Sequence, residues 1–104
     1  MPMLERCTVV LDGDVTLESA RDVTEALARL GPGGTLLLDL SRARDVQGAT
    51  LAHLVRLFDT RGSSLTVRIT GLRERDCRLL RYLGFELDRT GRPVWSADAG
   101  ALDN

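Results

Sequence analysis

The chain has 104 residues, of which 43% are hydrophobic and 28% charged, a composition typical of a globular protein and unlike that of disordered or membrane chains. Its 14 basic and 15 acidic residues give a formal net charge of -1, so no overall field favours nucleic acid or an anionic membrane. A chain of this length buries roughly two-thirds of its unfolded surface in one core, which predicts a single folded domain.

The cysteines and the N-terminus bear on the cellular compartment. Cys7 and Cys77 are far apart in the sequence and lack the spacing of metal ligands, which favours reduced thiols, a cytoplasmic protein and no metal or other cofactor. Residues 1–6 have no basic segment followed by an apolar one, and no apolar run approaches the roughly 18 residues of a membrane-spanning helix. We expect no targeting signal.

The first two predicted elements are a strand and a helix. Residues 7–11 are β-branched and apolar and precede the turn-forming Asp12-Gly13-Asp14, which predicts a strand. From Leu17 onward apolar residues recur at three- and four-residue steps, which predicts an amphipathic helix with Thr16 as its N-cap and a stop at Gly31-Pro32.

The middle of the chain repeats this alternation. Residues 35–40 form a nearly unbroken apolar run typical of a buried parallel strand, and a second helix is predicted over residues 47–60. Residues 65–70 alternate apolar and polar side chains, as a half-exposed strand does. A third helix carrying several leucines ends at Gly84, and the charged stretch of residues 73–76 that opens it is interpreted as a solvated helix face.

Residues 85–87 are the last predicted strand, so the order is βαβαβαβ: an α/β fold with a small, mostly parallel sheet and three helices packed against it. The predicted domain covers residues 1–87, and residues 88–104 are predicted to be a loosely ordered tail. Trp95 is the one predicted anchor in this tail, and packing against the body is favoured over binding a partner.

Three stretches together resemble the STAS domain family, the bacterial anti-sigma factor antagonists and related modules. Residues 9–20 resemble the family's strand, turn and helix entry, residues 36–41 resemble its central strand ending in Asp-Leu-Ser, and residues 65–72 with 79–85 resemble its strand-helix unit. The resemblance implies a non-enzymatic, bacterial protein-interaction module that takes part in transcription regulation.

The same resemblance identifies a modification site that is altered here. In the family, a kinase-type anti-sigma factor phosphorylates the first Ser of Asp-Ser-Ser-Gly at the start of a helix, and the sequence here is Asp45-Val46-Gln47-Gly48. Val46 and Gln47 carry no hydroxyl to accept phosphate. Thr50 is the nearest alternative acceptor, but a hydroxyl inside a helix usually bonds its own backbone, so no phosphorylation is expected.

The resemblance predicts a contact surface at the start of the second helix, together with the loop near Asp14. Its members are Asp14, Asp45, Val46, Gln47, Gly48 and Thr50. Asp45 either caps the helix or offers its carboxylate to a partner, and capping is the simpler interpretation. The expected partner is a kinase-type anti-sigma factor; the alternatives are the ATPase of an ABC-type transporter and, more distantly, a small ligand or substrate held by Asp14, Asp45 and Thr50.

The sequence gives little support for a catalytic site or a phosphate-binding loop. His53 is the only histidine and has no partner nucleophile placed by the sequence, and the Gly-rich residues 31–35 precede a strand and lack the Lys of a phosphate-binding loop.

Residues 1–6 are short for the extra first strand usual in the family. The edge left open could pair with a second copy or be covered by Val94-Trp95.

Overall fold

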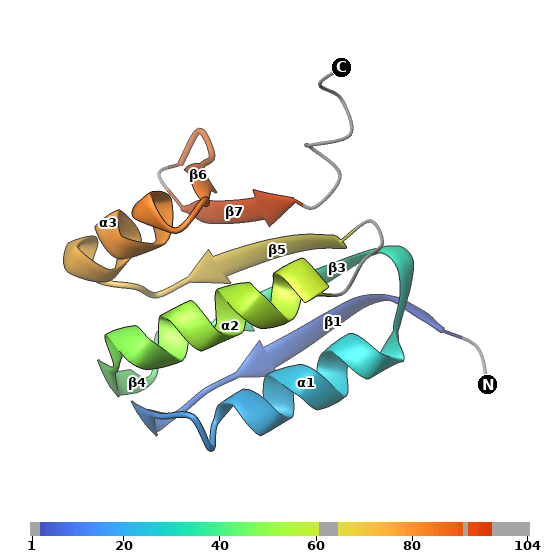
Figure 1. The fold of residues 1–104 in the computed structure, drawn as a ribbon, viewed down its shortest axis with the longest axis horizontal. Helices are drawn as coiled ribbons and strands as arrows, with labels where there is room; N and C mark the ends of the chain where they lie inside the picture. The colour runs from blue at the N-terminus through green and yellow to red at the C-terminus, as the bar shows by residue number, and fades with distance from the viewer. Residues whose placement is uncertain (1–2, 61–64, 91, 97–104) are drawn as a thin grey trace.

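Alternating burial along the central strands establishes one core beneath two helices. A computed structural model of the chain describes residues 3–60, 65–90 and 92–96. β1 (Leu4–Val10), β3 (Leu30–Asp39) and β5 (Leu65–Thr70) run parallel, as predicted. Side chains on one face of β3 and β5 are buried, and Figure 1 shows α1 (Ala20–Arg29) and α2 (Gly48–Thr60) lying over the sheet.

The sheet is completed by two strands from the C-terminal part of the chain. Among the described residues, five strands pair in the order β1-β3-β5-β7-β6, where β6 is Glu86–Leu87 and β7 is Pro93–Ser96. β7 is antiparallel to both of its neighbours. The mostly parallel α/β fold is therefore confirmed, although the predicted last strand contacts β7 and not β5.

The expectation of a loosely ordered tail is wrong for β7, because this segment is a strand inside the sheet. Trp95 is buried, and its ring centroid lies 5.7 Å from that of Phe58 on α2. The packing role predicted for Trp95 is confirmed. Residues 97–104 lie outside the described part of the chain.

The ends of α1 differ from the prediction. The backbone N–H of Thr16 donates to Ser19 Oγ at 3.1 Å, so Thr16 begins a turn and the helix starts only at Ala20. Leu17 belongs to that turn and is exposed. At the other end Leu30 is already extended, so the helix runs directly into β3 and does not need the predicted stop at Gly31.

The third helix, α3 (Glu74–Tyr82), ends as predicted at a glycine. Gly84 has a φ of 115°, a conformation that side chains disfavour. The backbone N–H of Phe85 then donates to Leu80 O at 2.9 Å, which closes the last turn. Within the described residues, no helix is both long and apolar enough to cross a membrane.

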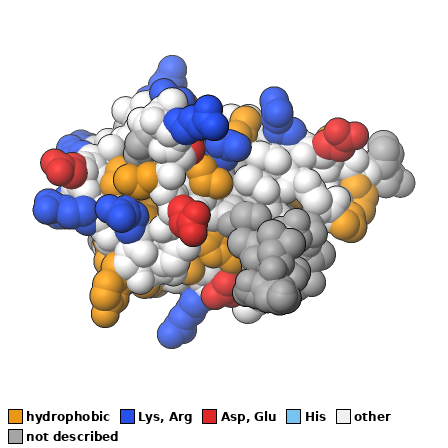
Figure 2. Space-filling model, turned by 90° about the horizontal axis from the view of Figure 1, so that it is seen from above, with side chains coloured by type: hydrophobic (Ala, Val, Ile, Leu, Met, Phe, Trp, Pro, Cys, Tyr) orange, Lys and Arg blue, Asp and Glu red, His pale blue; other side chains and the backbone are white. Residues whose placement is uncertain are grey.

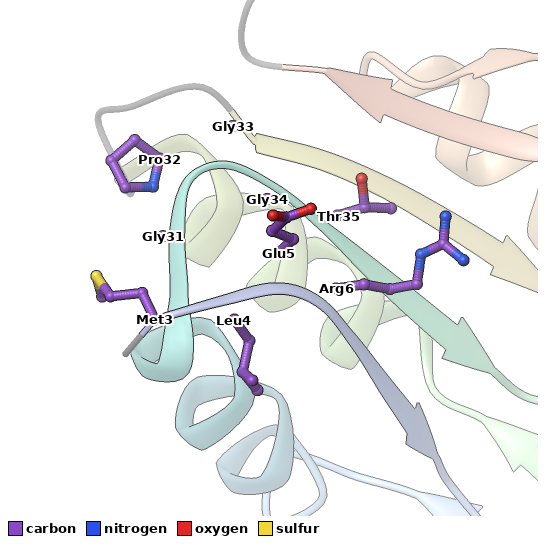
Figure 3. A pocket seen from close by; sticks show the side chains of 9 residues that line it. All are labelled: Met3, Leu4, Glu5, Arg6, Gly31, Pro32, Gly33, Gly34 and Thr35. Atoms are coloured by element: carbon purple, nitrogen blue, oxygen red, sulfur yellow. The ribbon is translucent and has the colours of Figure 1, made fainter. Parts of the chain in front are cut away.

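The start of β3 bends away from β1. Leu4 pairs with Leu30 and Arg6 pairs with Thr35, so residues 31–34 have a single residue of β1 opposite them. Figure 3 shows this segment arching off β1 and rejoining it at Thr35. A groove of about 580 Å³ results at the amino-terminal end of the two strands. The predicted turn is thus a wide bulge in the pairing of β3 with β1.

Candidate functional site

A short two-stranded ribbon, which the sequence did not reveal, builds the candidate site. After β1 the chain forms β2 (Gly13–Val15), and after β3 it forms β4 (Ala43–Val46); the two pair in parallel. Asp14 is opposite Asp45 in this ribbon. Figure 1 shows β4 at the end of the sheet to which the arrowheads of β1 and β5 point, beside the start of α2.

Hydrogen bonds to backbone carbonyls fix the ribbon to the turn before β4, to the residue that precedes α2 and to the start of α3. The N–H of Gly13 donates to Arg42 O at 3.2 Å, and the N–H of Gln47 donates to Val15 O at 3.4 Å. The guanidinium of Arg73, just before α3, donates to Arg44 O at 3.1 Å. These bonds hold the start of α2 in register with β2.

Asp39 contributes to the same structure from the end of β3. Hydrogen bonds from the Ser41 hydroxyl and from its backbone N–H, the latter at 2.9 Å, lower the pKa of the Asp39 carboxyl. The carboxylate thus stabilises the turn between β3 and β4. The Asp-Leu-Ser sequence at this point therefore has a structural role in presenting β4.

Burial divides the predicted contact residues into two groups. Asp14, Asp45, Gln47 and Gly48 are at the surface. Val46 is only 7% exposed and Thr50 is fully buried. The side chains of these two predicted contact residues therefore present little or no surface to a partner.

The start of α2 also corrects the interpretation of Asp45. The helix begins at Gly48, so Gln47 is the residue that precedes it. Asp45 lies in the middle of β4, paired with Asp14, and is too early in the chain to be the cap. Its carboxylate remains exposed beside the helix start.

The nearby charges leave these carboxylates accessible. Arg44 Nε lies 3.4 Å from Asp14 Oδ1, and both side chains are largely exposed, so water screens their attraction and the ion pair is worth little. Figure 2 views the side of β6 and β7, where arginines are spread among acidic and hydrophobic side chains instead of forming one basic stripe.

A groove next to the ribbon adds residues that sequence reasoning missed. It has a volume of about 600 Å³ and is lined by residues 45–48 and by Arg75, Asp76 and Leu79 of α3. Asp76 is only 5% exposed, and Arg75 Nε lies 3.5 Å from its Oδ1. The interpretation of residues 73–76 as a solvated face is therefore wrong for Asp76. Only the packing of α3 beside α2 could have revealed its burial.

The comparison with protein families decides the identity of the fold. The family model described as "Mlab, STAS domain" matches residues 3–87. The chain belongs to the STAS domain family. No curated protein and no solved structure gave a match. The family match makes the chain a member of a group of protein-interaction and regulatory modules, and β7 lies beyond the matched part of this STAS domain.

Hydroxyl groups are lacking where α2 of this STAS domain begins. None of the side chains from Asp45 to Ala49 carries a hydroxyl. The first one in the helix is that of Thr50, which has no exposed surface. Residues 45–50 therefore present no exposed hydroxyl group.

Proposed function

We propose that this STAS domain binds a regulatory protein constitutively, through a surface made by Asp14, Asp45, Gln47 and Gly48, called here the ribbon surface. The observation that carries the proposal is the β2–β4 pairing, which sets two exposed carboxylates side by side at the start of α2. The bonds that fix this start keep the surface ordered before a partner arrives, which reduces the entropy cost of binding.

Binding in this proposal does not depend on phosphorylation. A phosphate at the start of a helix would alter the contact surface and its charge, and in this segment the side chains that could accept it are missing or buried. Control of the complex then rests with the amount or the state of the partner.

The leading partner is a kinase-type anti-sigma factor, on the strength of the resemblance in strand and helix order. The second candidate is the ATPase of an ABC-type transporter. The lack of accessible hydroxyls at the helix start favours this second candidate, because an adaptor that is not switched needs no phosphate acceptor. Identification of the captured protein separates the two.

Affinity capture from the native lysate, followed by mass spectrometry, tests the proposal. Gln47→Arg places a long cationic side chain on the ribbon surface and should strongly reduce recovery of the partner. His53→Arg adds a cation at another exposed position of α2 and should leave recovery unchanged. Equal recovery by the wild type and Gln47→Arg would refute the proposed surface.

A further inference from the structure

In the described part of the chain, the outer side of β1 is a sheet edge without a neighbouring strand. Among the strands that the structure describes, β1 pairs with β3 alone. From the sequence, Val94 and Trp95 are one of two segments that could cover this edge. These residues pair instead with β5, at the other side of the sheet. An uncovered edge presents a row of backbone donors and acceptors that can template pairing with another strand.

The direction of these backbone groups follows from one hydrogen bond. The N–H of Leu11 donates to Asp39 O at 3.1 Å, toward β3. Because successive residues of a strand alternate in direction, the backbone groups of Thr8 and Val10 point outward, and so do those of Arg6 and Leu4. The backbone groups of the alternate residues Cys7 and Val9 point toward β3, and their side chains pack against the core.

Apolar side chains accompany this edge. Leu4 is 43% and Val10 is 48% exposed, and Met3, just before the strand, is also exposed. They lie at the two ends of β1, with Arg6 and Thr8 between them. An edge strand with large apolar side chains at both ends is suited to a partner strand that presents the same pattern in reverse.

We propose that a second copy of this chain pairs with β1 antiparallel, about a two-fold axis at Cys7. Leu4 then lies across from Val10 of the partner subunit, and Arg6 lies across from Thr8 of the partner subunit. The outward backbone groups of each pair bond to one another, and all seven residues of β1 are used. The pairing thus buries four exposed apolar side chains, two from each copy.

The symmetric pairings with the two-fold axis one residue away, at Arg6 or Thr8, are less favourable. Moving the axis to Arg6 sets two arginines directly opposite each other, which is destabilising, and shortens the ladder. Moving it to Thr8 leaves Leu4 without a partner. The axis at Cys7 also brings two copies of α1 together, and its exposed side chains include both signs of charge (Arg21, Asp22, Glu25 and Arg29).

The two Cys7 residues provide a direct test. In the proposed register they form a pair that exchanges no backbone hydrogen bonds. The Cα atoms of such a pair in an antiparallel ladder lie about 4.5 Å apart, which is within the range that a disulfide spans. Mild oxidation with copper phenanthroline in air should yield a covalent dimer, as two thiols give up two protons and two electrons to the oxidant. Cys77→Ser should retain this dimer and Cys7→Ser should lose it.

Light scattering during size-exclusion chromatography, with increasing protein concentration, tests the noncovalent pairing. The wild type should approach twice the monomer mass. Thr8→Pro removes an outward N–H and should stay monomeric and resist cross-linking, whereas Thr8→Val should behave as wild type. Val10→Arg places a charge against Leu4 of the partner subunit and provides the same test should Thr8→Pro fail to fold.

Several outcomes would contradict pairing of two copies through β1. A mass that stays monomeric at millimolar concentration, or cross-linking that runs through Cys77, would overturn the proposal. So would a dimer that survives both Thr8→Pro and Val10→Arg. Capture of a foreign strand by a monomeric protein also counts against it. None of these outcomes involves the ribbon surface, which is tested separately.

Discussion

Thr50 carries a buried hydroxyl for which the described structure provides no hydrogen-bond partner. The residue lies in the first turn of α2, its side chain is fully buried, and its Oγ1 is unsatisfied. Replacing Thr50 with Val keeps the branched shape and exchanges the hydroxyl for a methyl group. We expect Thr50→Val to stabilise the domain.

The magnitude follows from the desolvation of the hydroxyl. A buried polar group without a partner costs about 1–3 kcal/mol, and Val and Thr have similar helix propensities. Allowing for an imperfect fit of the new methyl group, the gain should be about 1 kcal/mol. In a domain of this size, 1 kcal/mol raises the Tm by roughly 4 °C or more.

Urea unfolding followed by circular dichroism measures this gain as a higher midpoint with an unchanged slope. Thr50→Ser is the matched control. It keeps the hydroxyl and loses a buried methyl group, and should therefore cost about 1 kcal/mol. A Thr50→Val protein that is less stable than wild type would refute the reasoning, because the hydroxyl must then have a partner that stabilises the fold.

Three further predictions concern other parts of the fold. Trp95→Ala removes the ring that packs on α2 and should cost about 3–5 kcal/mol in urea unfolding, a loss that a disordered tail would not show. Gly71 and Gly33 both have positive φ, but a side chain at 71 would overlap neighbouring backbone, whereas position 33 is open. Gly33→Ala should therefore cost about 1–2 kcal/mol, and Gly71→Ala should cost distinctly more. Hydrogen bonds from the Thr90 side chain and the Arg92 backbone lower the pKa of Asp88, so its contribution to stability is present above its unfolded pKa of about 3.9 and is lost as the pH falls through the lower folded value. The stability difference between wild type and Asp88→Asn should accordingly shrink in acid titrations below about pH 4.

The central strands and helices were predictable because hydrophobic periodicity reports directly on burial. The apolar run of residues 35–40 and the alternation of residues 65–70 both became parallel strands, as expected. The glycine at the end of α3 was equally informative, because its conformation is a local property of the chain. These features depend on neighbouring residues alone.

The ribbon and the last strand were missed for a different physical reason. β2 and β4 are only three and four residues long, too short for any period to show, and their pairing joins segments about 30 residues apart. β7 is similarly short and contains a proline. Long-range pairing decided all three, and local propensity gave no signal for it.

The candidate site was predicted in part. The sequence predicted that Asp14 and Asp45 lie near each other at the start of α2, and the ribbon pairing agrees with that nearness. It did not distinguish exposed from buried members, because Val46 and Thr50 are turned inward by the strand and helix geometry. The buried Asp76 entered the site only through the packing of α3.

A comparison of two exposed aspartates, Asp45 and Asp59, tests directly whether a partner binds the ribbon surface. Once the captured partner has been identified, its affinity is measured by titration calorimetry for the wild type, Asp45→Arg and Asp59→Arg, which make the same charge change at opposite ends of the segment formed by β4 and α2. Asp45→Arg should weaken binding at least tenfold, and Asp59→Arg should bind as the wild type does. Equal affinities for the two variants would contradict it.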